Sequence, residues 1–116
     1  MEDWGRYVQQ HLKGAAGKTR YLDKAQFEVL HSPLPGAGDS FAMGWRAGVA
    51  DGKTGSLWHN GSNKYWYCEV YANTEAGYAV LVTTNAPQAK SKVAAGELMS
   101  LVVAERHRWL PAKKTD

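Results

Sequence analysis

The chain has 116 residues, enough for one domain with a modest core. Its net charge of +3 comes from Lys and Arg residues scattered singly or in pairs, which indicates a solvated surface and argues against a nucleic-acid partner. The single cysteine, Cys68, excludes an intramolecular disulfide and a cysteine-based zinc cluster, and no apolar run reaches the ~20 residues of a membrane span. We expect residues 1–116 to form one domain. Because no signal peptide is recognisable, we expect this domain in the cytoplasm.

Two helices are predicted in the first third of the chain. The first begins near Asp3, carries apolar side chains at helical spacing and is expected to stop at Gly14. The second has Asp23 as its N-cap and Gln26 three residues later, which is the pattern of a capping box. Pro33 is expected to end it, because the residue before a proline avoids helical backbone angles.

Four strands are predicted in the middle of the chain. Residues 41–49 form the first, Asp51-Gly52 is the turn signal, and residues 56–60 return as the second. Residues 65–73 alternate, so that Cys68 and Val70 share one face while Tyr67 and Glu69 share the other. Residues 78–85 are apolar on both faces, which predicts a strand that is central or covered.

A long helix is predicted to begin at Pro87 and to end the domain. Its main apolar stripe is expected to contain Leu98, Leu101, Val102 and Trp109. The order of two helices, four strands in a meander and a helix predicts an α+β fold. We therefore expect an antiparallel sheet of about four strands, packed by the N-terminal helices and the long C-terminal helix.

Three short motifs then follow one another at characteristic positions. They are "FAMGW" at 41–45, "HNGSN" at 59–63 and "YAVLVTTN" at 78–85, with the terminal helix behind them. This order resembles the C-terminal part of the serine β-lactamase and penicillin-binding-protein-like hydrolases, in the branch of class C β-lactamases, esterases and D-aminopeptidases. The resemblance covers roughly residues 2–108 and rests on order and spacing. It implies part of the α/β domain of that family.

The resemblance also implies a site at the end of the second strand. The family's third signature is Lys-Thr-Gly or His-x-Gly, and the matching stretch is predicted to bind substrate through His59, Asn60, Gly61, Ser62 and Asn63. His59 would donate a hydrogen bond to a carboxylate or carbonyl, and Gly61 would let the strand approach an acyl group. Lys53-Thr54-Gly55 spells the signature more literally, but we expect it to lie in a hairpin turn.

The nucleophile of that family is missing. Its first signature is Ser-x-x-Lys, in which the lysine accepts the proton of the serine, and no serine here has lysine three residues later. No catalytic residue is therefore predicted. The four histidines lack metal-ligand spacing, so neither a metal nor a cofactor is expected. A Ser-His-Asp triad of another kind stays open because triads are spatial, and "HNGSN" as a plain polar strand end also stays open.

Two functions follow from the resemblance. The first is a stand-alone, non-catalytic domain that keeps the third signature and binds small acyl or peptide-like ligands, or a partner, weakly. The second is the C-terminal part of a serine hydrolase that is active only with the missing region, which a separate chain would supply. By resemblance the last strand, Tyr78 to Asn85, lacks a neighbour, so we also predict a homodimer through this strand and the terminal helix.

Overall fold

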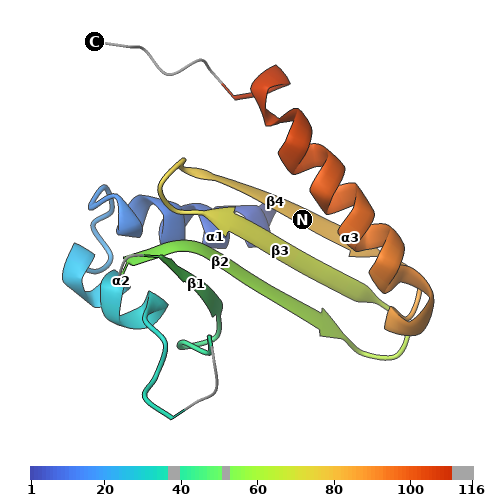
Figure 1. The fold of residues 1–116 in the computed structure, drawn as a ribbon, viewed down its shortest axis with the longest axis horizontal. Coiled ribbons are helices and arrows are strands. Elements are labelled where there is room, and N and C mark those ends of the chain that lie inside the picture. Colours follow the sequence, from blue (N-terminus) through green and yellow to red (C-terminus); the bar gives the residue numbers. More distant parts are fainter. Residues whose placement is uncertain (37–39, 51–52, 111–116) are drawn as a thin grey trace.

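The computed structural model describes residues 1–36, 40–50 and 53–110. The helices are α1 (Glu2–Ala15), α2 (Lys24–His31) and α3 (Gln88–Ala104), which continues as the 3-10 turn η1 (Glu105–Arg108). The strands are β1 (Arg46–Ala50), β2 (Lys53–Ser62), β3 (Tyr67–Asn73) and β4 (Tyr78–Thr84). They form one antiparallel sheet in the order β1-β2-β3-β4 (Figure 1). The predicted α+β fold with a four-stranded meander is confirmed, and the predicted turn at Asp51-Gly52 lies outside the described residues.

The sheet is covered by helices on both faces, and each face has its own core. On one face α1 packs against a cluster made of Val8, Ala42, Trp45, Ala47, Leu57, Val70 and Ala72. On the other face α3 packs against a cluster made of Tyr67, Tyr78, Val80, Val82 and Ala95. Alternation along β3 divides its side chains between the two clusters as predicted, since successive residues of a strand point to opposite faces. No helix in the described ranges is long and apolar enough to cross a membrane.

The contact between α1 and α2 corrects the prediction for Gly14. This glycine does not stop α1 but lies inside it, where a Cβ atom would stand 2.3 Å from the ring of Phe27 in α2. The absence of a side chain at Gly14 therefore lets the two helices approach. Gly17, with a φ of +67°, takes the left-handed position that follows the helix end. The start of α2 is as predicted, with the Asp23 N–H donating to Oε1 of Gln26 at 2.9 Å.

Residues 41–45 are a tight bend and not the first half of a strand. Gly44 has a φ of +80°, and the Ala42 N–H donates to the Trp45 carbonyl at 2.8 Å, so the chain reverses before β1. Strand β1 then begins only at Arg46, which forms an isolated bridge with Phe41. The alternation of large and small residues at 41–49 predicts a strand. Glycine, however, can adopt either the extended backbone of a strand or the left-handed backbone of a bend, so the pattern alone does not decide between them.

Strand β2 is longer than predicted and includes Lys53-Thr54-Gly55. These residues do not lie in a solvent-exposed turn, because Lys53 pairs with Ala50 and Thr54 with Val49. The hydroxyl of Thr54 donates to the carbonyl of His31 at 3.0 Å, which ties the beginning of β2 to the end of α2. The Lys53-Thr54-Gly55 stretch is thus part of β2 and connects the sheet to α2.

The face of α3 that contacts the sheet coincides only in part with the predicted one. Ser91 and Ala95 are buried, whereas Leu98 and Leu101 are 50% and 64% exposed. The prediction was wrong for Leu98 and Leu101, because α3 is apolar on most of its circumference and spacing alone does not identify the buried side. Only Val102 of the predicted stripe packs in the core together with Met99, Val103 and Leu110.

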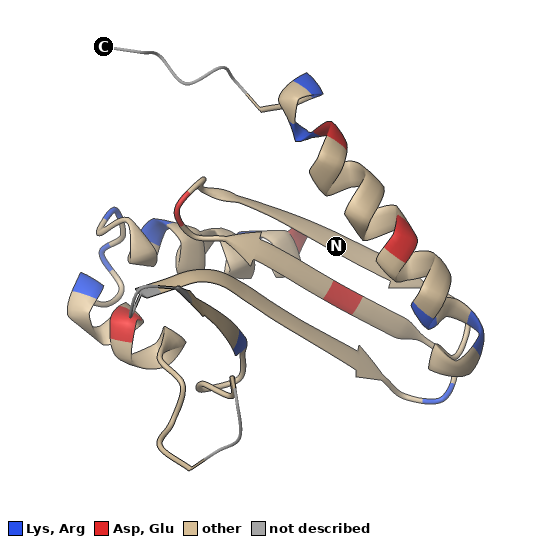
Figure 2. Cartoon of the chain, viewed as in Figure 1, with Lys and Arg blue, Asp and Glu red and all other residues tan. Residues whose placement is uncertain are grey.

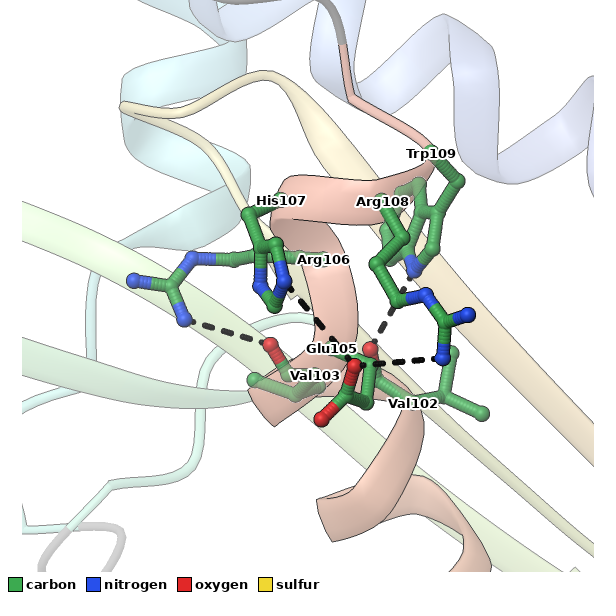
Figure 3. A network of polar contacts seen from close by, with 7 residues as sticks. All are labelled: Val102, Val103, Glu105, Arg106, His107, Arg108 and Trp109. Atoms are coloured by element: carbon green, nitrogen blue, oxygen red, sulfur yellow. Dashed lines mark hydrogen bonds and ion pairs between the residues drawn. The ribbon is translucent and has the colours of Figure 1, made fainter.

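Charged residues lie mainly on the helices and connections, and β4 carries none (Figure 2). After α3, polar contacts connect η1 and the following Trp109 to the last helical turn (Figure 3). The indole N–H of Trp109 donates to the Val102 carbonyl at 3.3 Å, and Oε2 of Glu105 lies 3.6 Å from Nη1 of Arg108. The ring of Trp109 also meets that of Tyr78 edge-on at 5.5 Å, which anchors the end of α3 over β4.

Candidate functional site

The end of β2 extends beyond β1, so that this inner strand lacks a neighbour on one side there. Strand β1 pairs with β2 from Lys53 to Trp58 only, whereas β3 pairs with β2 as far as Ser62. Among the described residues, no strand therefore pairs with residues 59–62 on the β1 side. Such a free edge presents N–H and C=O groups to which an extended peptide or acyl group can bind.

A groove of about 250 Å³ lies beside this free edge, on the face that α1 covers. The imidazole of His59 is exposed at this face, because His59 alternates with the buried Leu57 and stands opposite Val70 of β3. The groove is lined by three aromatic residues and by residues of β2, β3 and the bend: Trp4, Tyr7, Gly44, Trp45, His59, Asn60, Gly61, Cys68 and Val70. None of these carries a fixed negative charge that would repel a carboxylate.

Trp45, one of the residues that line this groove, carries a polar group without a partner among the described residues. Trp45 is 2% exposed. The ring of Tyr7 is stacked on its ring with the centroids 6.4 Å apart, and the ring of His11 meets it edge-on with the centroids 5.0 Å apart. Its indole Nε1 is nonetheless buried without an acceptor among the described residues. A buried N–H without a partner costs about 1–3 kcal/mol, which is why buried donors normally have one. A ligand oxygen would relieve this cost.

Gly61 is a glycine that the fold does not need. Its φ is not in the left-handed region, and an added Cβ would meet only Sγ of Cys68, at an ordinary 3.7 Å. This differs from Gly14, where a side chain would collide with Phe27. The space over Gly61 is therefore open on the side of the groove, which suits a group that approaches the strand from outside.

The five predicted site residues do not all reach the same place. His59 and Gly61 lie on the groove side, while Asn60 points to the other face beside Glu69, its neighbour in β3. The Ser62 hydroxyl donates to the Trp66 carbonyl at 2.9 Å. Oδ1 of Asn63 accepts from the N–H groups of residues 65 and 66. Ser62 and Asn63 thus shape the β2–β3 connection.

A second groove, of about 610 Å³, lies on the opposite face between α3 and the strands β1, β2 and β3. Here the Tyr67 hydroxyl donates to Oε2 of Glu69 at 2.8 Å. Burial, followed by this carboxylate, raises the pKa of Tyr67 to about 12. The other carboxylate oxygen of Glu69 is buried without a donor among the described residues.

Four of the serine side chains in the described part of the chain are engaged with the backbone and not with His59. They are Ser32, Ser62, Ser91 and Ser100, whose hydroxyls donate to backbone carbonyls. The same residues contain no group of three or more His, Cys, Asp and Glu side chains that could hold a metal ion. The half-buried Cys68 also lines the groove that contains His59.

Two other histidines form a buried pair that sequence spacing did not reveal. Nδ1 of His11 in α1 lies 2.8 Å from Nε2 of His31 in α2, and their side chains are 7% and 3% exposed. Burial lowers the pKa of both, and burial together with the charge of His11 brings the pKa of His31 to about 4. The pair is therefore neutral at pH 7 and links the two helices.

Comparison with protein-family models, with curated proteins and with solved structures gave no match for this chain. The resemblance to β-lactamase-like hydrolases accordingly stays a prediction, and the function has to be argued from the site itself. Sequence patterns pointed to the end of β2 but not to Trp4, Tyr7 and Trp45, which complete the groove. Their only signal was apolar spacing, which is equally typical of a core.

Proposed function

We propose that this chain is a non-catalytic binding module for small acyl or peptide-like ligands that carry a carboxylate or carbonyl group. The ligand would lie along the free edge of residues 59–62 and place an oxygen in the groove beside His59. The observation that carries the proposal is that Trp45, a residue that lines this groove, has a buried indole N–H with no acceptor among the described residues. An oxygen acceptor is the ligand group that this donor requires.

The other features of the groove support the same ligand class. His59 offers a second donor, the aromatic rings of Trp4 and Tyr7 offer apolar contact, and Gly61 leaves the strand open to close approach. Turnover is not part of this proposal. Acyl transfer requires a nucleophile hydrogen-bonded to a base, and the serine hydroxyls whose bonds are described donate to carbonyls instead.

Acetyl-D-alanyl-D-alanine, a peptide-like ligand with a free carboxylate, tests the proposal by titration with tryptophan fluorescence as the readout. We expect weak binding that His59→Ala reduces about 3- to 10-fold, the loss of one hydrogen bond. His107→Ala is the matched control, because His107 is 74% exposed on η1, away from the groove. Equal binding by His59→Ala and the wild type would contradict the proposal.

A second candidate is the C-terminal part of a serine hydrolase, as the resemblance implies. The observation that favours it is that residues 59–62 have one side without a pairing strand in the described part of the chain, where a nucleophile carried by another polypeptide could approach. The test is hydrolysis of nitrocefin and p-nitrophenyl esters by this chain, alone and together with a chain that carries Ser-x-x-Lys. Turnover by the mixture that His59→Ala abolishes would favour this candidate, and the first predicts no turnover in either case.

A further inference from the structure

The buried histidine pair is in direct contact with residues of the proposed ligand groove. The centroid of the His11 ring lies 5.1 Å from that of His31 and 5.0 Å from that of Trp45. The ring of His11 also meets that of Tyr7 edge-on, with the centroids 4.7 Å apart. Tyr7 and Trp45 both line the groove that contains His59. A change in the pair therefore acts on two residues of that groove through ring contacts.

The hydrogen bond between the two rings tolerates one added proton but not two. It joins Nδ1 of His11 to Nε2 of His31 over 2.8 Å, and a neutral pair uses one N–H and one lone pair to form it. A first proton from solvent can bind the nitrogen of the donating ring that is not part of the bond. A second proton has to bind the accepting nitrogen, which sets two N–H groups face to face. Two protonated rings therefore lose their bond and repel each other as like charges.

The ring of His11 is held by aromatic neighbours on α1, α2 and the bend before β1. Its side chain is buried, and its ring contacts those of Tyr7, Phe27 and Trp45. The ring can therefore separate from His31 only if α1 and α2 move apart. Tyr7 lies one helical turn before His11 in α1 and is stacked on Trp45 with the ring planes 7° apart. A movement of α1 thus disturbs this stack.

The charged residues that share a groove with the pair lie beside His31. This groove, of about 520 Å³, is lined by Lys24 and Glu28 of α2 and by Glu75 of the β3–β4 turn. Glu28 lies 3.8 Å from Lys24, and both carboxylates are exposed, so solvent screens their attraction for a protonated ring. Burial, followed by the charge of His11, lowers the pKa of His31 to about 4. The pair therefore takes up its second proton only at acidic pH.

We infer, on the basis of the proposed ligand function, that the His11–His31 pair is a pH-sensitive switch of the groove that contains His59. When both rings carry a proton, His11 separates from His31 and the contact between α1 and α2 opens. Tyr7 and Trp45 then lose the arrangement that forms the groove. Acidification therefore releases the ligand, and neutral pH restores the site.

The indole N–H resonance of Trp45 tests the switch without any ligand, in a titration from pH 7.5 to 4. Trp45→Phe identifies this resonance among those of the five tryptophans. An opened pair binds the proton of His31 near pH 6.5, so the ratio of open to closed protein should rise about 300-fold between pH 6.5 and 4. We expect the Trp45 resonance to change over this range while far-UV circular dichroism still shows a folded chain.

Three variants separate the pair from the other histidines. His31→Gln keeps a hydrogen-bonding partner for His11 but cannot take up the second proton, so its Trp45 resonance should stay in place. His107→Gln, at a histidine that is 74% exposed on η1, and His59→Gln, inside the groove, should both keep the wild-type transition. The inference would be overturned by a Trp45 resonance that ignores acid, that responds equally in His31→Gln, or that changes only when the whole chain unfolds.

Ligand binding gives the second readout. The dissociation constant of acetyl-D-alanyl-D-alanine should rise about 10-fold or more from pH 7 to 4.5 in the wild type, and clearly less in His31→Gln. An equal rise in both proteins would overturn the coupling between the pair and the groove. A failure to bind at pH 7 would instead contradict the proposed function, and the Trp45 resonance without ligand would still decide whether the pair moves the groove.

Discussion

Acidification should destabilise this protein through the His11–His31 pair. In the folded state both rings are neutral, and one ring donates the hydrogen bond that the other accepts over 2.8 Å. Burial lowers the pKa of His31 from 6.5 to about 4, with a further lowering by the charge of His11. In the unfolded chain the same group takes up its proton near pH 6.5. The unfolded state thus binds more protons between these values, so stability falls as the pH falls through this window.

The size of the effect follows from the pKa of His31. One pKa unit corresponds to about 1.4 kcal/mol, so the difference between 6.5 and about 4 removes about 3 kcal/mol of unfolding free energy by pH 4. This contribution is fully present above pH 6.5. Small domains are stable by about 5–15 kcal/mol, and the loss should therefore lower the urea midpoint visibly. Urea denaturation followed by tryptophan fluorescence at several values between pH 7.5 and 4 measures it.

A non-titrating variant separates this effect from carboxylate protonation. His31→Gln keeps a hydrogen-bonding side chain next to His11 but has no proton to take up. Between pH 6.5 and 4 its unfolding free energy should therefore fall by about 3 kcal/mol less than that of the wild type. His107→Gln, at a histidine that is 74% exposed, should behave as the wild type. If His31→Gln and the wild type lost the same stability over this range, the reasoning about the buried pair would be wrong.

Two glycines and one tyrosine provide further tests by urea denaturation. Gly14→Ala should cost about 1–3 kcal/mol, because the new Cβ would stand 2.3 Å from the ring of Phe27. Gly5→Ala, in the same helix with nothing within 4 Å, should instead stabilise by about 0.5–1 kcal/mol, and equal effects would contradict the packing of α1 on α2. Tyr67→Phe should lower the unfolding free energy by about 1–3 kcal/mol, because it removes the hydroxyl that donates to Oε2 of the half-buried Glu69. An unchanged urea midpoint would contradict that role.

Local chemistry in the sequence was enough to predict much of the fold. The capping box of Asp23 and Gln26 fixed the start of α2, and the alternation along β3 assigned its two faces. The errors occurred where one pattern suits two structures. Gly44 allowed a bend where alternation suggested a strand, and α3 is apolar on too many sides for spacing to show that Leu98 is exposed.

The site was predictable only in part, for a different reason. The polar end of β2 is contiguous in sequence, so the motif around His59 identified it. The groove, however, combines Trp4 and Tyr7 of α1 with Trp45 from the bend, and only the packing of α1 on the sheet brings them to this edge. The pairing of His11 with His31 likewise depends on how α1 crosses α2. Convergence of distant residues leaves no mark on local periodicity.

The indole N–H resonance of Trp45 tests the central claim of a binding groove most directly. Its donor is buried and has no acceptor among the described residues, so a bound oxygen should shift this resonance downfield. We predict that acetyl-D-alanyl-D-alanine shifts it in a saturable manner together with the amides of residues 59–61, and that His59→Ala weakens the response. An indole resonance that stays in place at millimolar ligand, or shifts confined to the groove under α3, would contradict the account.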